Sequence, residues 1–176
     1  ILTEPGLVEC TGVGQVVLGP RPGCGEDIEH AESAGAAFAS AGVETRVEAD
    51  MAPQLWEKLA VNAGINPVTA LARAENGALR TGPAGDLADR AAVEVADVAR
   101  DHGVSLTDAA ARDALARVVE TTAENRSSMY QDVSAGRRTE IDAISGYVVD
   151  RAQGAPPVNG TLAALVRTWE SARGLR

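Results

Sequence analysis

Positive charge and aromatic rings are scarce in this sequence. Its 176 residues include 16 Lys and Arg against 25 Asp and Glu, which gives a formal net charge of −9 at pH 7. Nucleic acids and anionic membranes are bound through clustered basic side chains, so this balance argues against both kinds of partner. Only 3% of the residues are aromatic. The apolar content therefore comes from Ala, Val and Leu, which favours helices packed closely through small side chains.

Long apolar runs and clustered metal ligands are lacking as well. No run approaches the ~20 apolar residues that cross a bilayer, and no basic stretch leads into an apolar segment with a small-residue cleavage site. We therefore expect a soluble, cytoplasmic protein. Cys10 and Cys24 fit neither a disulfide framework nor a zinc site. His30 and His102 have no ligand cluster near them in sequence, so no metal site is predicted.

The first fifty residues have the pattern of a small β-β-α-β segment, which is too little to close a sheet on its own. The elements are expected at residues 7–10, 15–18, 26–40 and 43–48. Thr11-Gly-Val-Gly14 predicts a hairpin between the first two strands. The Gly12-Val-Gly14 element also resembles a dinucleotide-binding turn, but Val17 stands at the third glycine position and a strand follows instead of a helix. A plain hairpin is therefore favoured.

Residues 51–176 are predicted to be almost entirely helical. Asp50 and Thr107 are N-cap candidates, and Gly103 is a helix stop. Apolar residues at helical spacing predict the inward faces: Leu87, Ala91, Val95 and Val98; Ala111, Leu115, Val118 and Val119; Ile141, Ile144, Val148 and Ala152; Leu162, Leu165, Val166 and Trp169. The chain is therefore interpreted as a remnant at 1–50 and an all-α domain at 51–176.

The single lysine, Lys58, requires an explanation in a chain that otherwise uses arginine. A guanidinium is always protonated, whereas an ammonium in a partly buried site can give up a proton. Lys58, Asn62 and Asn66 are spaced four residues apart, so on a helix they form one slanting stripe. Leu55 and Leu59 fall within the same arc, which places the polar stripe beside an apolar face. Its polar groups need partners from neighbouring helices or from a polar ligand.

Pro67 predicts a break in this helix. A residue before proline is disfavoured in the α conformation, so Asn66 is expected to cap a new helix that begins at Pro67. Asn76-Gly77 predicts a further turn. Such a break places side chains at the edge of a cavity, although capping and turn formation without any ligand are an alternative role for these asparagines.

A second polar group lies at 124–132 and 137–142. Asn125 and Ser128 are three apart and share a face if the segment is helical. Ser128 can donate to a carboxylate, and Glu140 can accept from a sugar hydroxyl or face a cation. Helix caps and a solvated charge run are the alternative, and we favour it for Arg137, Arg138 and Asp142.

Several motifs in order resemble a known family. They are Trp56-Glu-Lys-Leu-Ala-Val-Asn62, Ile65-Asn-Pro-Val-Thr-Ala70, Asn76-Gly77, Asn125-Arg-Ser-Ser-Met129, Gln131-Asp132 and Arg138-Thr-Glu-Ile-Asp142. Together they resemble the C-terminal domain of the ketopantoate reductase (2-dehydropantoate 2-reductase) family, and the resemblance runs from the N-terminal hairpin to Trp169. That family joins an NADPH-binding Rossmann domain to an α-helical domain, with the active site between them. The resemblance implies a mainly α fold, with the remnant of the Rossmann domain at 1–50, the substrate-binding and catalytic domain at 51–176, and the nucleotide fingerprint upstream of Ile1.

The resemblance also implies roles for individual residues. Lys58 occupies the position of the catalytic lysine, which contacts the substrate and supplies a proton. The positions that hold the substrate's carboxylate and hydroxyl are matched by Asn62, Asn66, Asn76 and Ser128, with Asn125 close to them. Glu140 falls on an acidic position associated with the cofactor. Ser145 departs from the family pattern, because asparagine is expected there.

The implied activity is NADPH-dependent reduction of 2-dehydropantoate to pantoate, on the route to pantothenate and coenzyme A. Without the nucleotide-binding domain, the 176-residue chain is expected to be inactive alone. Reduction of another branched 2-oxo acid is one alternative, and a non-catalytic helical dimerisation module is another. The Ala-rich helices are also compatible with a homodimer.

Overall fold

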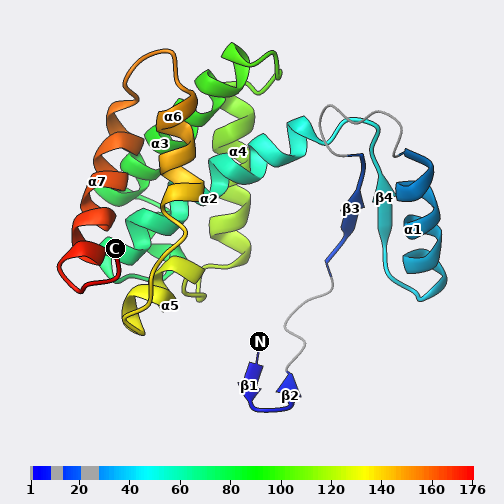
Figure 1. The fold of residues 1–176 in the computed structure, drawn as a ribbon, viewed down its shortest axis with the longest axis horizontal. Coiled ribbons are helices and arrows are strands. Elements are labelled where there is room, and N and C mark those ends of the chain that lie inside the picture. Colours follow the sequence, from blue (N-terminus) through cyan, green and yellow to red (C-terminus); the bar gives the residue numbers. More distant parts are fainter. Residues whose placement is uncertain (1, 9–13, 21–27) are drawn as a thin grey trace. The chain divides into compact units, whose positions relative to one another are not determined.

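The chain folds into two compact units, Ile1–Ala52 and Pro53–Arg176. The computed structural model describes residues 2–8, 14–20 and 28–176. Helices dominate it, as Figure 1 shows, so the expected mainly α fold is confirmed. Among the described residues, no helix has both the length and the apolar composition that a membrane span requires.

The first unit begins with a small antiparallel hairpin that the sequence did not predict. Strand β1 (Leu2–Glu4) pairs with β2 (Leu7–Val8) around Gly6, whose φ of 86° lies in the left-handed region that glycine adopts readily. In the described part of the chain, the sheet partner of β2 is β1 and not the next strand. The predicted hairpin pairing is therefore wrong for residues 7–8, and the rest of its first strand and most of its turn, residues 9–13, lie outside the described residues.

The rest of this unit is a β-α-β segment. Strands β3 (Val16–Leu18) and β4 (Thr45–Val47) are parallel, in the register Val16 to Thr45, and helix α1 (Ile28–Ser40) connects them. Parallel neighbours need such a crossover, because a tight turn can only reverse the chain. Gly35 of α1 faces β4 so closely that an added Cβ would lie 2.8 Å from the Val47 side chain. The helix therefore packs directly on the strand pair.

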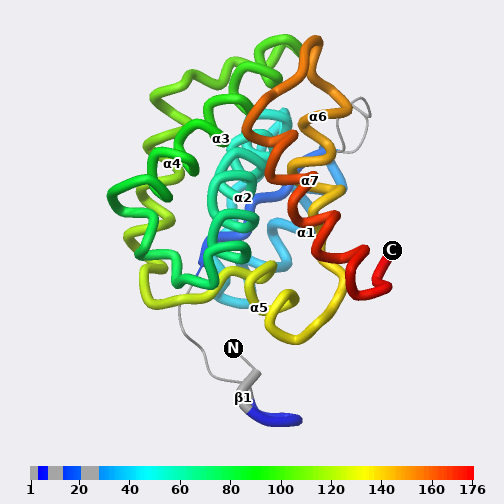
Figure 2. Tube along the Cα trace, turned by 90° about the vertical axis from the view of Figure 1, so that its left-hand side faces the viewer, coloured from blue at the N-terminus to red at the C-terminus, as the bar shows by residue number. Residues whose placement is uncertain are grey.

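The second unit, described throughout residues 53–176, contains six α-helices together with a 3-10 turn and a π-helical turn. Its elements in order are α2 (Ala52–Ala72), η2 (Asn76–Leu79), α3 (Gly82–Asp101), α4 (Asp108–Thr121), α5 (Ser128–Ser134), η3 (Asp142–Gly146), α6 (Tyr147–Arg151) and α7 (Pro157–Ser171). Figures 1 and 2 agree in placing α5 at one end of this unit. The N-cap prediction for Thr107 is confirmed, since its side chain accepts the Ala110 N–H at 3.1 Å.

Small residues let the helices of the second unit approach one another closely. Helix α3 contacts η2, α4, α6 and α7, and its buried face consists of Ala and Val together with Gly85. Gly64 of α2 lies against the α3 carbonyl of Ala88, where an added Cβ would stand 3.0 Å from the oxygen. The sequence-based expectation of a core built from small side chains is confirmed.

Helix α2 does not break at Pro67. It runs without interruption from Ala52 to Ala72, with Pro67 buried inside it, so the prediction that Asn66 caps a new helix is wrong. Proline removes one N–H donor from the helix, but burial of the whole stretch from Ala63 to Ala70 stabilises the helical conformation. At the other end of the helix, the Ala52 N–H bonds the Asp50 carboxylate at 2.9 Å, as expected of a cap.

Two other details differ from the sequence-based expectation. The helix predicted around Ile144 and Val148 is a π-helical turn, η3, followed by α6, although both side chains are buried as expected. Leu165, predicted to face inward on α7, is 51% exposed. Its neighbours Leu162 and Val166 fill the α7 core positions.

Candidate functional site

The stripe of Lys58, Asn62 and Asn66 is present on one continuous helix. Each step of four residues along α2 rises ~6 Å and turns ~40°. Exposure falls along the stripe, because Lys58 is exposed, Asn62 is half-buried and Asn66 is only 7% exposed. The polar groups therefore lead from the surface into the helical unit. Leu55, expected to border them within the apolar face, is 48% exposed.

Buried Thr69 links this stripe to the start of α5. Its hydroxyl donates to the Ile65 carbonyl at 2.8 Å and lies 2.7 Å from the Ser127 hydroxyl. Since the Thr69 proton is used by Ile65, Ser127 donates to Thr69, and Ser127 also accepts the Tyr130 N–H at 3.1 Å. Ser127 thus caps α5 and fixes Ser128, the exposed first residue of that helix. Thr69 and Ser127 were not predicted, although Thr69 follows Asn66 by three residues and continues the same helix face.

Asn76 is held rigidly next to this junction. Its backbone N–H donates to the Asn125 carbonyl at 2.9 Å, and its Nδ2 donates to the Thr122 hydroxyl at 2.9 Å. The following residue, Gly77, donates to the Ala123 carbonyl at 2.8 Å. Asn76 Oδ1 is buried and has no hydrogen-bond partner within the described part of the chain. Leaving a buried acceptor unpaired costs about 1–3 kcal/mol, so a ligand hydroxyl would be a favourable partner for this oxygen once binding opens access to it.

Asn125 and Ser128 do not share a helix face, contrary to the expectation. Asn125 lies in a turn, where its backbone N–H bonds the Thr122 carbonyl at 2.9 Å, and α5 begins only at Ser128. The contribution of Asn125 to the neighbourhood of Asn76 is its backbone carbonyl, and its side chain is exposed.

Glu140 lies on the segment between α5 and η3, away from any contact with the asparagines that the structure records. Its side chain is exposed, and its backbone carbonyl accepts the N–H groups of Ala143 and Ile144 at 3.0 and 3.1 Å. Within the described residues its carboxylate forms no ion pair. The carboxylate is therefore available to accept hydrogen bonds from a hydroxyl-bearing cofactor.

A fully buried carboxylate lies directly behind this segment. Glu170 of α7 is 0% exposed and accepts two hydrogen bonds from Thr139, from its N–H and its hydroxyl, both at 2.7 Å, and a third from Arg176 at 2.6 Å. Burial alone would raise the pKa of Glu170, but these donors outweigh burial and hold the pKa below its ordinary value. Glu170 was not predicted from the sequence, because Thr139, which donates two of the three hydrogen bonds, lies 31 residues away along the chain.

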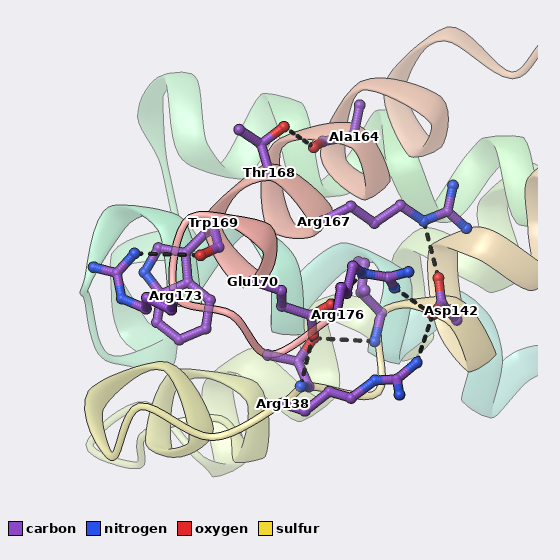
Figure 3. A network of polar contacts seen from close by, with 11 residues as sticks. Arg138, Asp142, Ala164, Arg167, Thr168, Trp169, Glu170, Arg173 and Arg176 are labelled. Carbon is purple, nitrogen blue, oxygen red and sulfur yellow. Dashed lines mark hydrogen bonds and ion pairs between the residues drawn. The ribbon is translucent and has the colours of Figure 1, made fainter.

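Asp142 extends the same network (Figure 3). Its carboxylate is paired with Arg176, with Arg167 at 2.9 Å and with Arg138 at 3.6 Å. Partial burial raises the pKa of Asp142, and the hydrogen bonds from Arg176 and Arg167 more than offset this, so that the pKa is lowered. The side chains of Arg138 and Asp142 are 61% and 42% exposed, in keeping with the expected solvated charge run, and Asp142 in addition belongs to a defined cluster of ion pairs.

An aromatic cluster fixes the first turns of α2, which carry Lys58. The Trp56 ring stacks on His102 with centroids 6.0 Å apart and meets the Tyr147 ring at 5.9 Å. His102 also bonds the Arg151 carbonyl through Nε2 at 3.0 Å. The turn of α2 that carries Lys58 is therefore held by contacts with the end of α3 and with α6.

No metal cluster accompanies these residues within the described part of the chain. In the described ranges, no three His, Cys, Asp or Glu side chains are placed to hold a metal ion. A shallow pocket of about 510 Å³ beside Gly77 is lined by charged side chains, including Arg73, Glu75 and Arg126, but contains none of the predicted site side chains.

Comparison with known proteins identifies similar sequences and structures. The family model for the C-terminal domain of ketopantoate reductase (PanE/ApbA) matches residues 50–170. A 2-dehydropantoate 2-reductase of Halobacterium salinarum is 43% identical over 94% of this chain and 55% of its own length. One from Pyrococcus horikoshii is 36% identical over 99% of this chain and 58% of its own.

A solved structure agrees with these sequence matches. A PanE/ApbA family ketopantoate reductase from Ralstonia eutropha JMP134 superposes with a TM-score of 0.79 at 33% identity, over 93% of this chain and 54% of that one. The chain thus spans little more than half the length of the relatives that it matches.

Proposed function

The chain belongs to the ketopantoate reductase family, and from this premise we propose that it is the substrate-binding half of an NADPH-dependent 2-dehydropantoate 2-reductase. In this proposal, residues 51–176 bind and protonate the substrate. Residues 1–50 complete the nucleotide-binding domain of a longer parent polypeptide. The parallel β3-α1-β4 segment supports this division, because parallel strands occur almost only in larger sheets covered by helices.

Lys58 is proposed as the proton donor. Reduction of a 2-oxo acid adds a hydride to the carbonyl carbon, and the nicotinamide ring of the bound cofactor would supply that hydride. As the carbon–oxygen double bond becomes a single bond, negative charge grows on the oxygen. An ammonium stabilises this charge and transfers one proton to the oxygen, which leaves a neutral amine and an alcohol. Arginine would supply the charge without the proton.

The amides and Ser128 are proposed to orient the substrate. Asn62 and Asn66 lie on successive turns of the helix that carries Lys58, so their amides line one approach to its ammonium. Asn76 offers its unpartnered Oδ1 to the substrate hydroxyl, and Ser128 offers a hydroxyl to the carboxylate. Asn125 supports Asn76 through its backbone carbonyl. The exposed Glu140 carboxylate is proposed to contact the cofactor.

One observation supports this proposal most strongly. A single unbroken helix presents Lys58, Asn62 and Asn66 in order, and Thr69 bonds it to the cap of the helix that begins with Ser128. The polar groups that a 2-oxo acid needs are thereby joined in one rigid arrangement, which is the condition for stabilising charge in a transition state.

The test uses the longer parent polypeptide with NADPH and 2-dehydropantoate. We expect turnover that falls by a factor on the order of 10²–10⁴ in Lys58→Gln, as for the loss of a general acid. Lys58→Arg is the matched variant that keeps the charge. Lys58→Arg should still have a reduced kcat, but its KM for the 2-oxo acid should rise less than that of Lys58→Gln. Full activity of Lys58→Arg would contradict proton donation, and a parent that reduces only a different branched 2-oxo acid would correct the substrate.

The 176-residue chain alone is expected to show no NADPH oxidation. A cytoplasmic location, a place in pantothenate and coenzyme A synthesis, and a homodimer are further parts of this proposal. Measuring the mass of the parent in solution tests the last of them.

A further inference from the structure

We propose that Glu170 is a positioning residue that holds Glu140 in place for the reaction. This inference rests on the proposed function, in which Glu140 contacts the cofactor. Glu170 has no access to substrate or cofactor, because it is 0% exposed. Its effect would be transmitted through the backbone of the segment that carries Glu140.

On the N-terminal side of Glu140, Thr139 makes the contacts with Glu170. Glu170 Oε1 accepts both the N–H and the hydroxyl of Thr139 at 2.7 Å. The Thr139 hydroxyl in turn accepts the N–H of Ile141 at 3.3 Å, and this bond spans Glu140. One carboxylate oxygen therefore fixes the residues on both sides of Glu140.

The C-terminal side of Glu140 is fixed by the same network. Arg176 bridges the two carboxylates, since it donates to Glu170 at 2.6 Å and pairs with Asp142. Asp142 is held by Arg167 as well, at 2.9 Å. The Glu140 carbonyl closes the first turn of η3 by accepting the N–H of Ile144 at 3.1 Å.

The result is an exposed acidic side chain on an immobilised backbone. Such an arrangement lowers the cost of ordering Glu140 when it meets a ligand. Burying a carboxylate is unfavourable, because the ion must be desolvated, and an ordinary surface loop does not require it. Here the buried carboxylate of Glu170 fixes Thr139 and, through it, Ile141, so the backbone of Glu140 between them is held in place.

The test is a double-mutant cycle in the longer parent polypeptide. We expect Glu140→Gln to raise the KM for NADPH, and Glu170→Gln to raise it on the order of tenfold, the effect of weakening one charge-assisted hydrogen bond. If Glu170 acts through Glu140, the double variant should be no worse than Glu140→Gln alone. The KM for the 2-oxo acid should change less than that for NADPH in all three variants.

Glu94→Gln is the matched control. Glu94 is also a carboxylate that accepts backbone N–H groups, those of Val158 and Asn159 at 2.8 Å, but it holds the start of α7 and does not touch the Glu140 segment. Any effect of Glu94→Gln on the KM for NADPH should add to that of Glu140→Gln. If Glu170→Gln folds poorly, Thr139→Val and Thr139→Ser provide a second comparison. Only the serine variant retains the hydroxyl that donates to Glu170, so it should keep the KM for NADPH near that of wild type, whereas the valine variant should raise it.

The outcomes separate the two proposals. Additive effects of Glu140→Gln and Glu170→Gln would overturn the positioning role and leave the function of Glu140 intact. If Glu140→Gln has no effect on NADPH, its cofactor role is refuted and the positioning role is refuted with it. Turnover that depends on Lys58 would survive either result.

Discussion

Replacing Gly64 by alanine tests whether the close approach of α2 to its neighbours sets the geometry of the site. Gly64 lies between Asn62 and Asn66 on α2. An added Cβ would stand 2.9 Å from Leu115 Cδ1 and 3.0 Å from the backbone oxygen of Ala88. The Ala88 oxygen belongs to the backbone of α3 and can yield only if that helix shifts, whereas Leu115, only 2% exposed, would have to repack its side chain in the core.

Gly160→Ala is the matched control for helix propensity. Gly160 is inside α7, and an added Cβ there would meet nothing closer than Val149 Cγ2 at 4.0 Å. Glycine to alanine inside a helix stabilises by about 0.8–1 kcal/mol, a term that both variants share. The difference in the free energy of unfolding between the two variants is therefore the overpacking cost at Gly64, which is about 1–3 kcal/mol.

The assay is thermal and guanidinium unfolding of both purified variants, followed by circular dichroism. At roughly 4 °C per kcal/mol for a domain of this size, Gly64→Ala should melt about 4–12 °C below Gly160→Ala. In the longer parent, Gly64→Ala should also raise the KM for the 2-oxo acid, since Asn62 and Asn66 move with the helix. Equal melting temperatures would show that α2 adjusts freely, and the account of the rigid stripe would be refuted.

Three further predictions concern individual side chains. Folding lowers the pKa of Glu170, so the ionised side chain contributes to the free energy of unfolding above its ordinary pKa of 4.5, and this contribution is lost as the pH falls through the folded value. The difference in the free energy of unfolding between wild type and Glu170→Gln should therefore become smaller as the pH is lowered from 7. Asn76→Ala should raise the KM for the 2-oxo acid about tenfold in the parent, as expected for one lost hydrogen bond, whereas Thr122→Ser, which keeps the acceptor for Asn76 Nδ2, should leave it unchanged. Thr107→Ala should cost about 1 kcal/mol by chemical unfolding, because it removes the α4 cap to Ala110, and Thr107→Ser should restore it.

The failures of sequence reasoning share one cause. Pro67 predicts a helix break because its effect on neighbouring residues is local, but burial of α2 on neighbouring helices overrides that preference. The hairpin prediction for 7–18 relied on adjacency in sequence, whereas β3 pairs with β4 across a helix. In each case contacts between distant residues decided the outcome.

The local features of this protein could be predicted from spacings along the chain. Helical periodicity, the Thr107 cap, and the Lys58, Asn62 and Asn66 stripe depend on spacings of three or four residues, which a regular helix converts directly into geometry. The motifs that match the family are likewise continuous stretches. The hydrogen bonds of Ser127 with Thr69 and of Thr139 with Glu170 could not be predicted in this way, because these pairs are separated by 58 and 31 residues and meet only in the folded chain. Such partners are selected by burial and by the need to satisfy every buried polar group, and no spacing within one element specifies them.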